Sequence, residues 1–335
     1  MRKYFLFITM IVLLMISTAC QSSSSSSVNK TDNSENNIEE LNIAFSTWVG
    51  YAPFYIAEEK GFFEKNGVNV KLMRIESSSD RLSALAANKI QGIGGTVDSH
   101  VVAAARNIPL VQVISTEESS GGDGIIAKKD IKSFKDLKGK KVAVQTDGGA
   151  SFFWFNYLLK QEGMSMDDMD IQSMSSGDAG AAFVANKVDA AITWEPWLTN
   201  AKNTDFGHVL MTTAETPGII ASSFALHRDY VEENPEQVKG FVQSWFDAIE
   251  YFKTNEADAI SIMAKAMGQT DEEFKEALEG VTLYDKEKTI EYVGTKENPG
   301  QLYELTTLGA ELWTEQKIID KEPNVEDLID YSFIE

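Results

Sequence analysis

Residues 41–72 read LNIAFSTWVGYAPFYIAEEKGFFEKNGVNVKL. The stretch opens on a short apolar strand at 41–45 and closes on a second one at 68–74, with a helical segment between them. Strands that alternate with helices are the pattern of an α/β protein built on largely parallel sheets. We therefore expect an α/β fold from residue 41 onward.

The same alternation continues along the chain in two series of strands. The expected strands lie at 41–45, 68–74, 91–94 and 110–114, then at 141–145, 171–174, 188–193 and 209–212. Helical stretches cover 152–161 and 179–186, and after one more apolar run at 219–226 the chain is mostly helical to its end. One helix, with Pro235 in its first turn, repeats apolar residues at i, i+3, i+4 and i+7. This stripe (Val238, Phe241, Val242, Trp245 and Ile249) is expected to be core, and a partner-binding groove is the alternative.

The composition narrows the class of partner. The 335 residues hold 51 acidic and 30 basic side chains, a net charge of −21, and no stretch supplies a basic stripe. Such a chain repels polyanions, which argues against nucleic acid and against an anionic membrane surface. The single cysteine excludes an internal disulfide framework and a cysteine-cluster metal site, and we expect no cofactor and no metal.

The first 19 residues have the features of a secretory signal. Arg2 and Lys3 precede an apolar run at 4–16, and small residues lead up to Cys20. A helix over this run is roughly 20 Å long, too short for the ~30 Å hydrocarbon core. Cys20 stands where a bacterial lipoprotein signal places its lipidated cysteine, so the signal resembles a lipoprotein signal. Ordinary secretion with a free thiol is the alternative.

Residues 20–40 follow as a tether. Six consecutive serines at 22–27 precede a stretch rich in Asn, Asp and Glu, and such a sequence cannot bury apolar surface. We expect a flexible leash with a reach of about 25 Å between the lipidated Cys20 and a folded part that starts at 41.

Candidate ligand-binding residues lie in the loops that follow the strands. In open parallel sheets, ligands bind beyond the carboxyl ends of the strands. The loops at 46–51, 94–99, 116–124, 146–151 and 193–197 supply aromatic walls, hydroxyls and carboxylates but no Lys or Arg, and Asp178 is expected near the last loop. Such a mixture suits a pocket for a small solute. The candidates are Trp48, Tyr51, Thr96, Asp98, Ser120, Asp123, Asp147, Ser151, Asp178, Trp194 and Glu195.

Each candidate also has a purely structural explanation. Large aromatics such as Trp48 and Trp197 can plug the edges of a domain. Asp98, Asp178 and Glu195 can cap helices, and the 121–124 segment can be a plain turn.

The loops carry features for both signs of charge. Helix starts at 96–99 and 148–151 offer free backbone N–H groups, which favour an anion. Carboxylates and indole faces favour an ammonium or guanidinium group. A zwitterion, or a neutral polar molecule, satisfies both.

The sequence carries little that predicts catalysis. It has no G-x-S-x-G, P-loop or G-x-G-x-x-G motif, and its three histidines lack zinc-binding spacing. The pair of carboxylates Asp178 and Glu195 leaves a secreted hydrolase as an alternative from another class. A sensor or adhesin is a third class.

The quoted stretch at 41–72 resembles the opening of solute-binding proteins of ABC importers in the nitrate/sulfonate/taurine group. These share a fold with the proteins for a pyrimidine precursor of thiamine. Further matches are GGTVDS at 94–99, DLKGKKVAV at 136–144, ANKVDAAITWEPW at 185–197 and DLIDYSFIE at 327–335. Their order along the chain makes the resemblance specific over nearly all of 41–335.

The resemblance implies a two-lobed fold of the periplasmic-binding-protein type (a type II Venus-flytrap) with a two-strand hinge. Lobe one would comprise 41–125 plus 222–335, and lobe two 126–221. Trp48, Thr96, Asp98, Asp123 and Glu195 fall in the family's ligand loops. Relatives that hold nitrate or bicarbonate tend to use basic or metal-assisted sites, whereas these loops contain no Lys or Arg. Simple inorganic anions are therefore disfavoured as the solute.

The resemblance also implies a function. The chain would be a non-catalytic, monomeric binding protein, lipid-anchored on the outer face of the cytoplasmic membrane. It would deliver a small organic solute to an ABC permease with a separate ATPase. An aliphatic sulfonate or taurine is favoured as the solute. A cationic or amine-bearing solute such as a guanidine or urea compound, or a pyrimidine precursor of thiamine, is the alternative.

Overall fold

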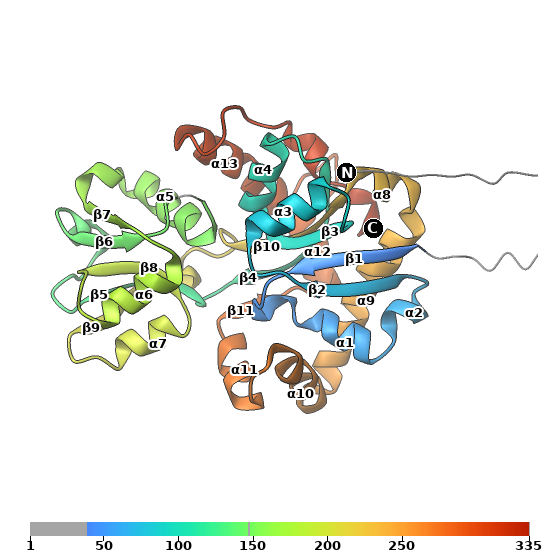
Figure 1. The fold of residues 1–335 in the computed structure, drawn as a ribbon, viewed down its shortest axis with the longest axis horizontal. Coiled ribbons are helices and arrows are strands. Elements are labelled where there is room, and N and C mark those ends of the chain that lie inside the picture. The colour runs from blue at the N-terminus through green and yellow to red at the C-terminus, as the bar shows by residue number, and fades with distance from the viewer. Residues whose placement is uncertain (1–38, 147, 335) are drawn as a thin grey trace, which may run out of the picture. The chain divides into compact units, whose positions relative to one another are not determined.

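The computed structural model describes residues 39–146 and 148–334. The expected signal at 1–19, the lipidation of Cys20 and most of the tether at 20–40 lie outside the described residues, as does the candidate Asp147. The described chain holds two β-sheets with helices packed around each (Figure 1). The expected α/β class is confirmed.

The first sheet has six strands in the order β11-β4-β10-β3-β1-β2. Every strand expected in the first series is present, and the run expected at 219–226 forms the sheet's return strand. The strands are β1 (Glu40–Phe45), β2 (Asn69–Arg74), β3 (Gly92–Thr96), β4 (Leu110–Ser119), β10 (Ala221–His227) and β11 (Val281–Leu283). The short β11 was not predicted.

The second sheet has five strands in the order β7-β6-β8-β5-β9. The four strands of the second series are all present, and β5 is an addition, since the sequence predicted only a turn at its start. The strands are β5 (Asp123–Lys128), β6 (Lys141–Val144), β7 (Asp170–Ser173), β8 (Ala190–Trp194) and β9 (Gly207–Thr212).

The sheets are mixed, which corrects the expectation of largely parallel sheets. β1 pairs in parallel with β2 and β3, and β6 with β7 and β8. β10 is antiparallel to both β3 and β4, β11 is antiparallel to β4, and β5 is antiparallel to both β8 and β9. The physical reason is the chain path. The chain leaves the first sheet along β4, enters the second along β5, and returns along β10 in the opposite direction.

Two sets of helices accompany the sheets (Figure 1). With the six-stranded sheet are α1 (Pro53–Glu59), α2 (Phe62–Lys65), α3 (Ser78–Ala86), α4 (Val97–Ala105), α8 (Arg228–Glu233), α9 (Pro235–Thr254), α10 (Glu256–Met267), α11 (Asp271–Leu278), α12 (Lys286–Val293) and α13 (Gln301–Glu315). With the five-stranded sheet are α5 (Ala150–Glu162), α6 (Ser176–Val184) and α7 (Trp197–Lys202). Short 3₁₀ turns cover Val49–Tyr51, Phe134–Leu137, Met166–Asp168, Thr213–Glu215, Val325–Leu328 and Tyr331–Phe333.

The apolar stripe of α9 is core, as expected. All five of its predicted residues are buried. The Phe54 ring of α1 stacks on Phe241 with ring centroids 4.7 Å apart and lies 5.1 Å from Trp245. Because helix α1 of the same protein covers this stripe, the stripe is not exposed as a groove for a partner.

Contacts also join the helices of the two sheets. Phe152 of α5 stacks on Trp313 of α13, with centroids 5.7 Å apart. Lys160 of α5 forms an ion pair with Glu315 of α13, at 3.0 Å between Nζ and Oε1. Helix α5, which opens at the candidate loop 146–151, thereby contacts the C-terminal helix α13.

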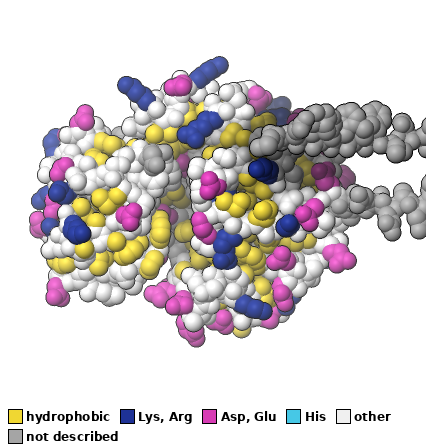
Figure 2. Space-filling model, in the orientation of Figure 1, with side chains coloured by type: hydrophobic (Ala, Val, Ile, Leu, Met, Phe, Trp, Pro, Cys, Tyr) yellow, Lys and Arg dark blue, Asp and Glu magenta, His cyan; other side chains and the backbone are white. Residues whose placement is uncertain are grey.

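One face of the molecule can be seen with its side chains coloured by charge. Figure 2 shows acidic side chains spread over the visible face and interspersed with Lys and Arg. No helix among residues 39–146 and 148–334 is both long and apolar enough to cross a membrane.

Candidate functional site

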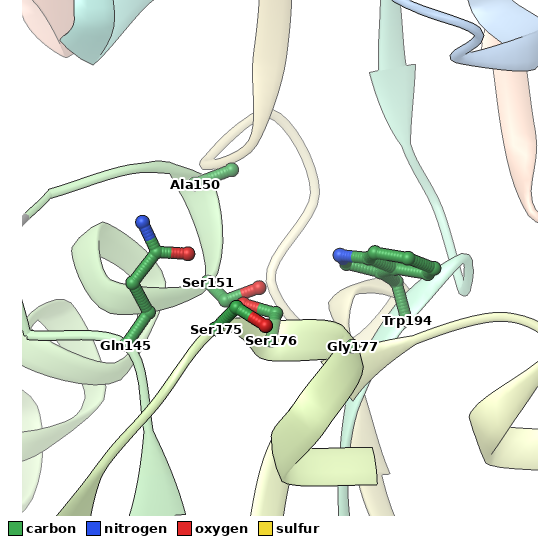
Figure 3. A pocket seen from close by; sticks show the side chains of 7 residues that line it. All are labelled: Gln145, Ala150, Ser151, Ser175, Ser176, Gly177 and Trp194. Atoms are coloured by element: carbon green, nitrogen blue, oxygen red, sulfur yellow. The ribbon is translucent and has the colours of Figure 1, made fainter. Parts of the chain in front are cut away.

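A cavity of about 390 Å³ lies in the five-stranded part of the chain. Its walls come from the end of β6, the first turns of α5 and α6, and the end of β8 (Figure 3). This is where the strand-end rule placed a site. The lining residues are Gln145, Ala150, Ser151, Ser175, Ser176, Gly177 and Trp194. Two of them, Ser151 and Trp194, were candidates from the sequence.

The first turn of α5 borders this cavity, and no side chain among the described residues caps its N–H groups. Gly148 and Gly149 precede the helix with φ of 116° and 90°, a conformation that favours glycine. Gly149 is the N-cap and has no side chain to accept from the first N–H groups. Ser151 follows in the same turn and is buried. Free N–H groups and the positive end of the helix dipole favour an anionic group here.

The first turn of α6 borders the same cavity. Ser175 is its N-cap and accepts from the Asp178 N–H at 3.2 Å, and its hydroxyl donates to Asp178 Oδ2 at 2.7 Å. The helix was expected to begin after Asp178, but it begins at Ser176 because Ser175 takes the cap position. Asp178 is exposed and its carboxylate serves the cap. These contacts are those expected if Asp178 takes part in capping the helix.

Two tryptophans flank the start of α7. Trp194 is 37% exposed and its indole forms one wall of the cavity (Figure 3). Trp197 instead packs on α6, where a Cβ added to Gly180 would lie 2.3 Å from Trp197 Cγ. Trp194 is therefore free to contact a ligand, while Trp197 is a packing residue.

Both oxygens of Glu195 are engaged at the start of α7. Oε2 accepts from the Thr199 N–H at 3.0 Å, and Oε1 accepts from the Thr199 hydroxyl at 3.1 Å. The Glu195 N–H donates to the Gly122 carbonyl at 3.0 Å. Glu195 thus fixes the end of β8 and the start of α7, as the capping alternative described.

Ser120 and Asp123 lie where the chain crosses from β4 to β5. The Ser120 hydroxyl shares a hydrogen bond of 2.8 Å with Thr282, and the Asp123 N–H donates to Ser119 Oγ at 3.2 Å. Asp123 is buried, and its register partner across the β5–β8 pair is Trp194. Burial raises the pKa of Asp123 to about 6. In the 121–124 segment, residues 121 and 122 therefore lie between the strands, and residues 123 and 124 begin β5.

Trp48 and Tyr51 come from the turn after β1. Trp48 is half-buried and its Nε1–H donates to Glu117 Oε1 at 3.0 Å. Tyr51 is buried, and its hydroxyl shares a hydrogen bond of 3.1 Å with Ser222. The turn is thus tied to the two strands, β4 and β10, that link the sheets.

Glu117 is a buried carboxylate that the sequence reasoning missed. It is 1% exposed, and its Oε2 has no hydrogen-bond partner among the described residues. Burial raises its pKa to about 7, with hydrogen bonds from Ser222 and Trp48 opposing the rise. β4 was expected to end at residue 114, and pairing with β10 and β11 extends it to Ser119. The sequence feature that could have identified Glu117 as a candidate is the pair of adjacent glutamates in the 116–124 loop.

Thr96 and Asp98 open helix α4. Thr96 is the N-cap residue without a side-chain cap bond. Asp98 is 3% exposed, and its Oδ2 has no partner within the described chain. Burial raises the pKa of Asp98 to about 6, against hydrogen bonds that include one from Thr96. Asp98 is therefore a buried acid in the first turn of α4.

One buried basic residue was not among the sequence candidates, because it lies on a helix and not in a loop after a strand. Arg81 of α3 is 9% exposed and donates to the carbonyls of Ile75 and Glu76. Its charge acts on the pKa of Tyr51 and of His100. Within the described residues no group of three or more His, Cys, Asp or Glu could hold a metal ion.

A chain with two α/β sheets, two linking strands and a cavity at its strand ends has the architecture of the periplasmic-binding-protein class. The chain belongs to the NMT1/THI5-like family, whose model matches residues 48–259.

Similar proteins carry names of binding proteins. A putative aliphatic sulfonates-binding protein of Bacillus subtilis (strain 168) is 26% identical over 291 residues, 84% of each chain. The taurine-binding periplasmic protein of Escherichia coli (strain K12) is 25% identical over 76% of this chain and 82% of its own. The crystal structure of the periplasmic aliphatic sulphonate binding protein SsuA from Escherichia coli superposes with a TM-score of 0.73. It covers 87% of this chain and 92% of that one at 22% identity.

Proposed function

We propose that the protein is the solute-binding component of an ABC importer and that its solute is an aliphatic sulfonate of the taurine type. The observation that carries the proposal is the cavity of about 390 Å³ where the first turns of α5 and α6 meet beside Trp194. Two helix N-termini attract the sulfonate without a full basic charge, and the indole supplies apolar area for a short aliphatic chain.

The family and the named relatives support this proposal. Sulfonate and taurine appear in the names of two relatives that each align over three quarters or more of this chain. Catalysis has no comparable support, because the hydrolase hypothesis needed Asp178 and Glu195 as acid and nucleophile. Their carboxylates are hydrogen-bonded within helix caps.

We further propose that the solute is bound by closure of two lobes, 41–125 plus 222–335 and 126–221. The division of the strands between two sheets supports these boundaries. A solute that contacts both lobes would favour the closed state over the open one. Small-angle scattering should then show a smaller radius of gyration with solute, and an unchanged radius would count against closure.

The remaining parts of the proposal concern location and partners. We propose a monomer, lipid-anchored through Cys20 on the outer face of the membrane, that delivers its solute to a permease with a separate ATPase. Metabolic labelling with palmitate tests the anchor, because a Cys20→Ala variant should lose the label. Undiminished label in that variant would leave ordinary secretion as the explanation.

Isothermal calorimetry tests the solute class directly. The purified chain would be titrated with taurine and ethanesulfonate, and in parallel with nitrate, guanidinium and an aminopyrimidine. We expect saturable heat with at least one of the sulfonates and none with nitrate. Binding of the aminopyrimidine alone, or of no sulfonate at millimolar concentration, would contradict the proposal.

A further inference from the structure

We infer that the solute carries a protonated nitrogen and that Glu117 is the specificity-determining residue that binds it, with Asp123 beside it. The inference rests on the proposed function for the sulfonate end of the solute. Within the taurine type it assigns a binding residue to the amine, and it predicts that amino-sulfonates bind more tightly than sulfonates without a cationic group.

The carboxylate of Glu117 is held for an incoming donor. Trp48 Nε1–H binds Oε1 at 3.0 Å and so orients the group, while Oε2 is buried with no partner among the described residues. A buried acceptor without a donor costs free energy, which a donor from the solute would recover. An ammonium or guanidinium group is such a donor, and its charge strengthens the bond.

Two glycines shape the space around this carboxylate. A Cβ added to Gly50 would lie 2.6 Å from Trp48 Nε1 and 2.7 Å from Glu117 Cγ. A Cβ added to Gly122 would lie 3.1 Å from Trp48 Cη2. The indole of Trp48 therefore reaches from Glu117 to the crossing segment, and there is little room for any side chain at either glycine.

The same crossing segment leads from Glu117 in β4 to Asp123 in β5, next to the strand that carries the cavity residue Trp194. Asp123 follows Gly122 and is the register partner of Trp194, whose indole lines the cavity. Trp48 thus lies against Gly122, and Trp194 is the cross-strand neighbour of Asp123, so an indole adjoins each residue of the Gly122–Asp123 step. Indole faces and carboxylates together are the surroundings that bind organic cations.

Neither carboxylate forms an ion pair with a Lys or Arg in the part of the chain that the structure describes. Asp123 and Glu118 are the charged groups that act most on Glu117, and both are acidic. The nearby cations act elsewhere, because Lys288 acts on Glu118 and Arg81 acts on Tyr51. The raised pKa values of Glu117 and Asp123 are consistent with buried carboxyls in need of a counter-ion. A cationic solute would supply that charge.

The test compares taurine with isethionate, the same two-carbon sulfonate with a hydroxyl in place of the amine. By calorimetry at pH 7.5, the wild-type protein should bind taurine roughly 10- to 100-fold more tightly, the scale of one hydrogen bond between charged groups. The Glu117→Gln variant keeps the acceptor for Trp48 and removes the charge. It should lose most of this preference while its affinity for isethionate changes less than about threefold.

Glu118→Gln is the matched control, because it removes the same charge from the next residue of β4, which points to the opposite face of the strand. It should retain the preference for taurine. Equal wild-type affinity for taurine and isethionate, or an equal loss of both in Glu117→Gln, would overturn the inference and leave the proposed function standing. Binding of guanidinium but of no sulfonate, abolished by Glu117→Gln, would support the cation site and reject the sulfonate.

Discussion

At the scale of single residues, two glutamates of the candidate loops have opposite surroundings. Glu195 has both oxygens satisfied by Thr199 at the start of α7. Glu117 is buried with one oxygen satisfied and one without a partner in the described chain. A satisfied carboxylate has little to gain from a ligand, whereas an unsatisfied one gains a hydrogen bond. The two should therefore respond differently to the same Glu→Gln change.

For Glu195→Gln we expect a loss of stability without a loss of affinity. The amide keeps one acceptor for Thr199 but loses the charge at a helix start, which costs about 0.5–1 kcal/mol. Urea denaturation would measure the free energy of unfolding, and calorimetry would measure the affinity for taurine. An affinity more than tenfold weaker at unchanged stability would instead place Glu195 against the solute.

At the scale of elements, the first turns of α5 and α6 decide where an anion can sit. Gly149 and Ser175 are the two N-caps, and each leaves backbone N–H groups of the following turn at the cavity. The sequence indicated the α5 start from its Gly-Gly-Ala-Ser run. It placed the α6 start too late, because the serine that caps the helix precedes the aspartate expected in that position.

A charge added to the first turn of α6 should separate helix stability from ligand binding. Gly177 lines the cavity, and a Cβ there would meet only ordinary contacts at 3.8 Å and beyond. Gly177→Asp places a negative charge near the helix N-terminus, which should leave the helix as stable as before or stabilise it by roughly 0.3–1 kcal/mol. The same charge should repel the sulfonate and weaken its binding by about 10- to 100-fold.

Gly177→Ala is the control for that change, because it adds the Cβ without the charge. Ethanesulfonate should bind this variant within about threefold of wild type in calorimetry. If the alanine variant loses as much affinity as the aspartate variant, the effect is steric and the dipole argument for the anion site is wrong.

At the scale of the whole molecule, buried carboxyls link stability to pH. The pKa of Glu117 is raised by burial to about 7 in the fold, above its ordinary value of 4.5. Between these two values the folded protein binds more protons than the unfolded chain, so stability falls as pH rises through this range. Asp98 and Asp123 act in the same direction, since burial raises the pKa of each to about 6.

One buried group opposes this trend. Burial lowers the pKa of His100 to about 4, so its contribution to stability rises between pH 4 and its ordinary value of 6.5. The contribution of Glu117 is therefore best isolated by comparing the wild type with Glu117→Gln at several pH values.

We expect the two proteins to have similar free energies of unfolding at pH 5. At pH 8 the Glu117→Gln variant should be more stable by roughly 1–3 kcal/mol, because only the wild type must keep a buried charge. The charges of Asp123 and Glu118 also raise the pKa of Glu117. The phenols of Tyr51, Tyr284 and Tyr292 stay neutral in this range because their pKa values are raised. A difference in stability that does not change between pH 5 and 8 would contradict the assignment.

The α/β class, both series of strands, the buried stripe of α9 and the start of α5 could all be predicted from the sequence. These features follow from spacing within one segment, since periodicity and turn residues act over a few positions. The order of the motifs along the chain also indicated the family, because each motif is a run of neighbouring residues.

Which polar side chains have an unsatisfied hydrogen-bonding atom for a solute depends on the three-dimensional packing and could not be predicted from the sequence. Trp48 and Glu117 are separated by 69 residues, and their hydrogen bond exists because β1 and β4 share one sheet. Likewise, the charge of Arg81 affects the pKa of Tyr51 and of His100, although Arg81 lies on helix α3 and in none of the strand-end loops. Burial and hydrogen-bond partners depend on segments far apart in the chain, and spacing along the sequence does not encode them locally.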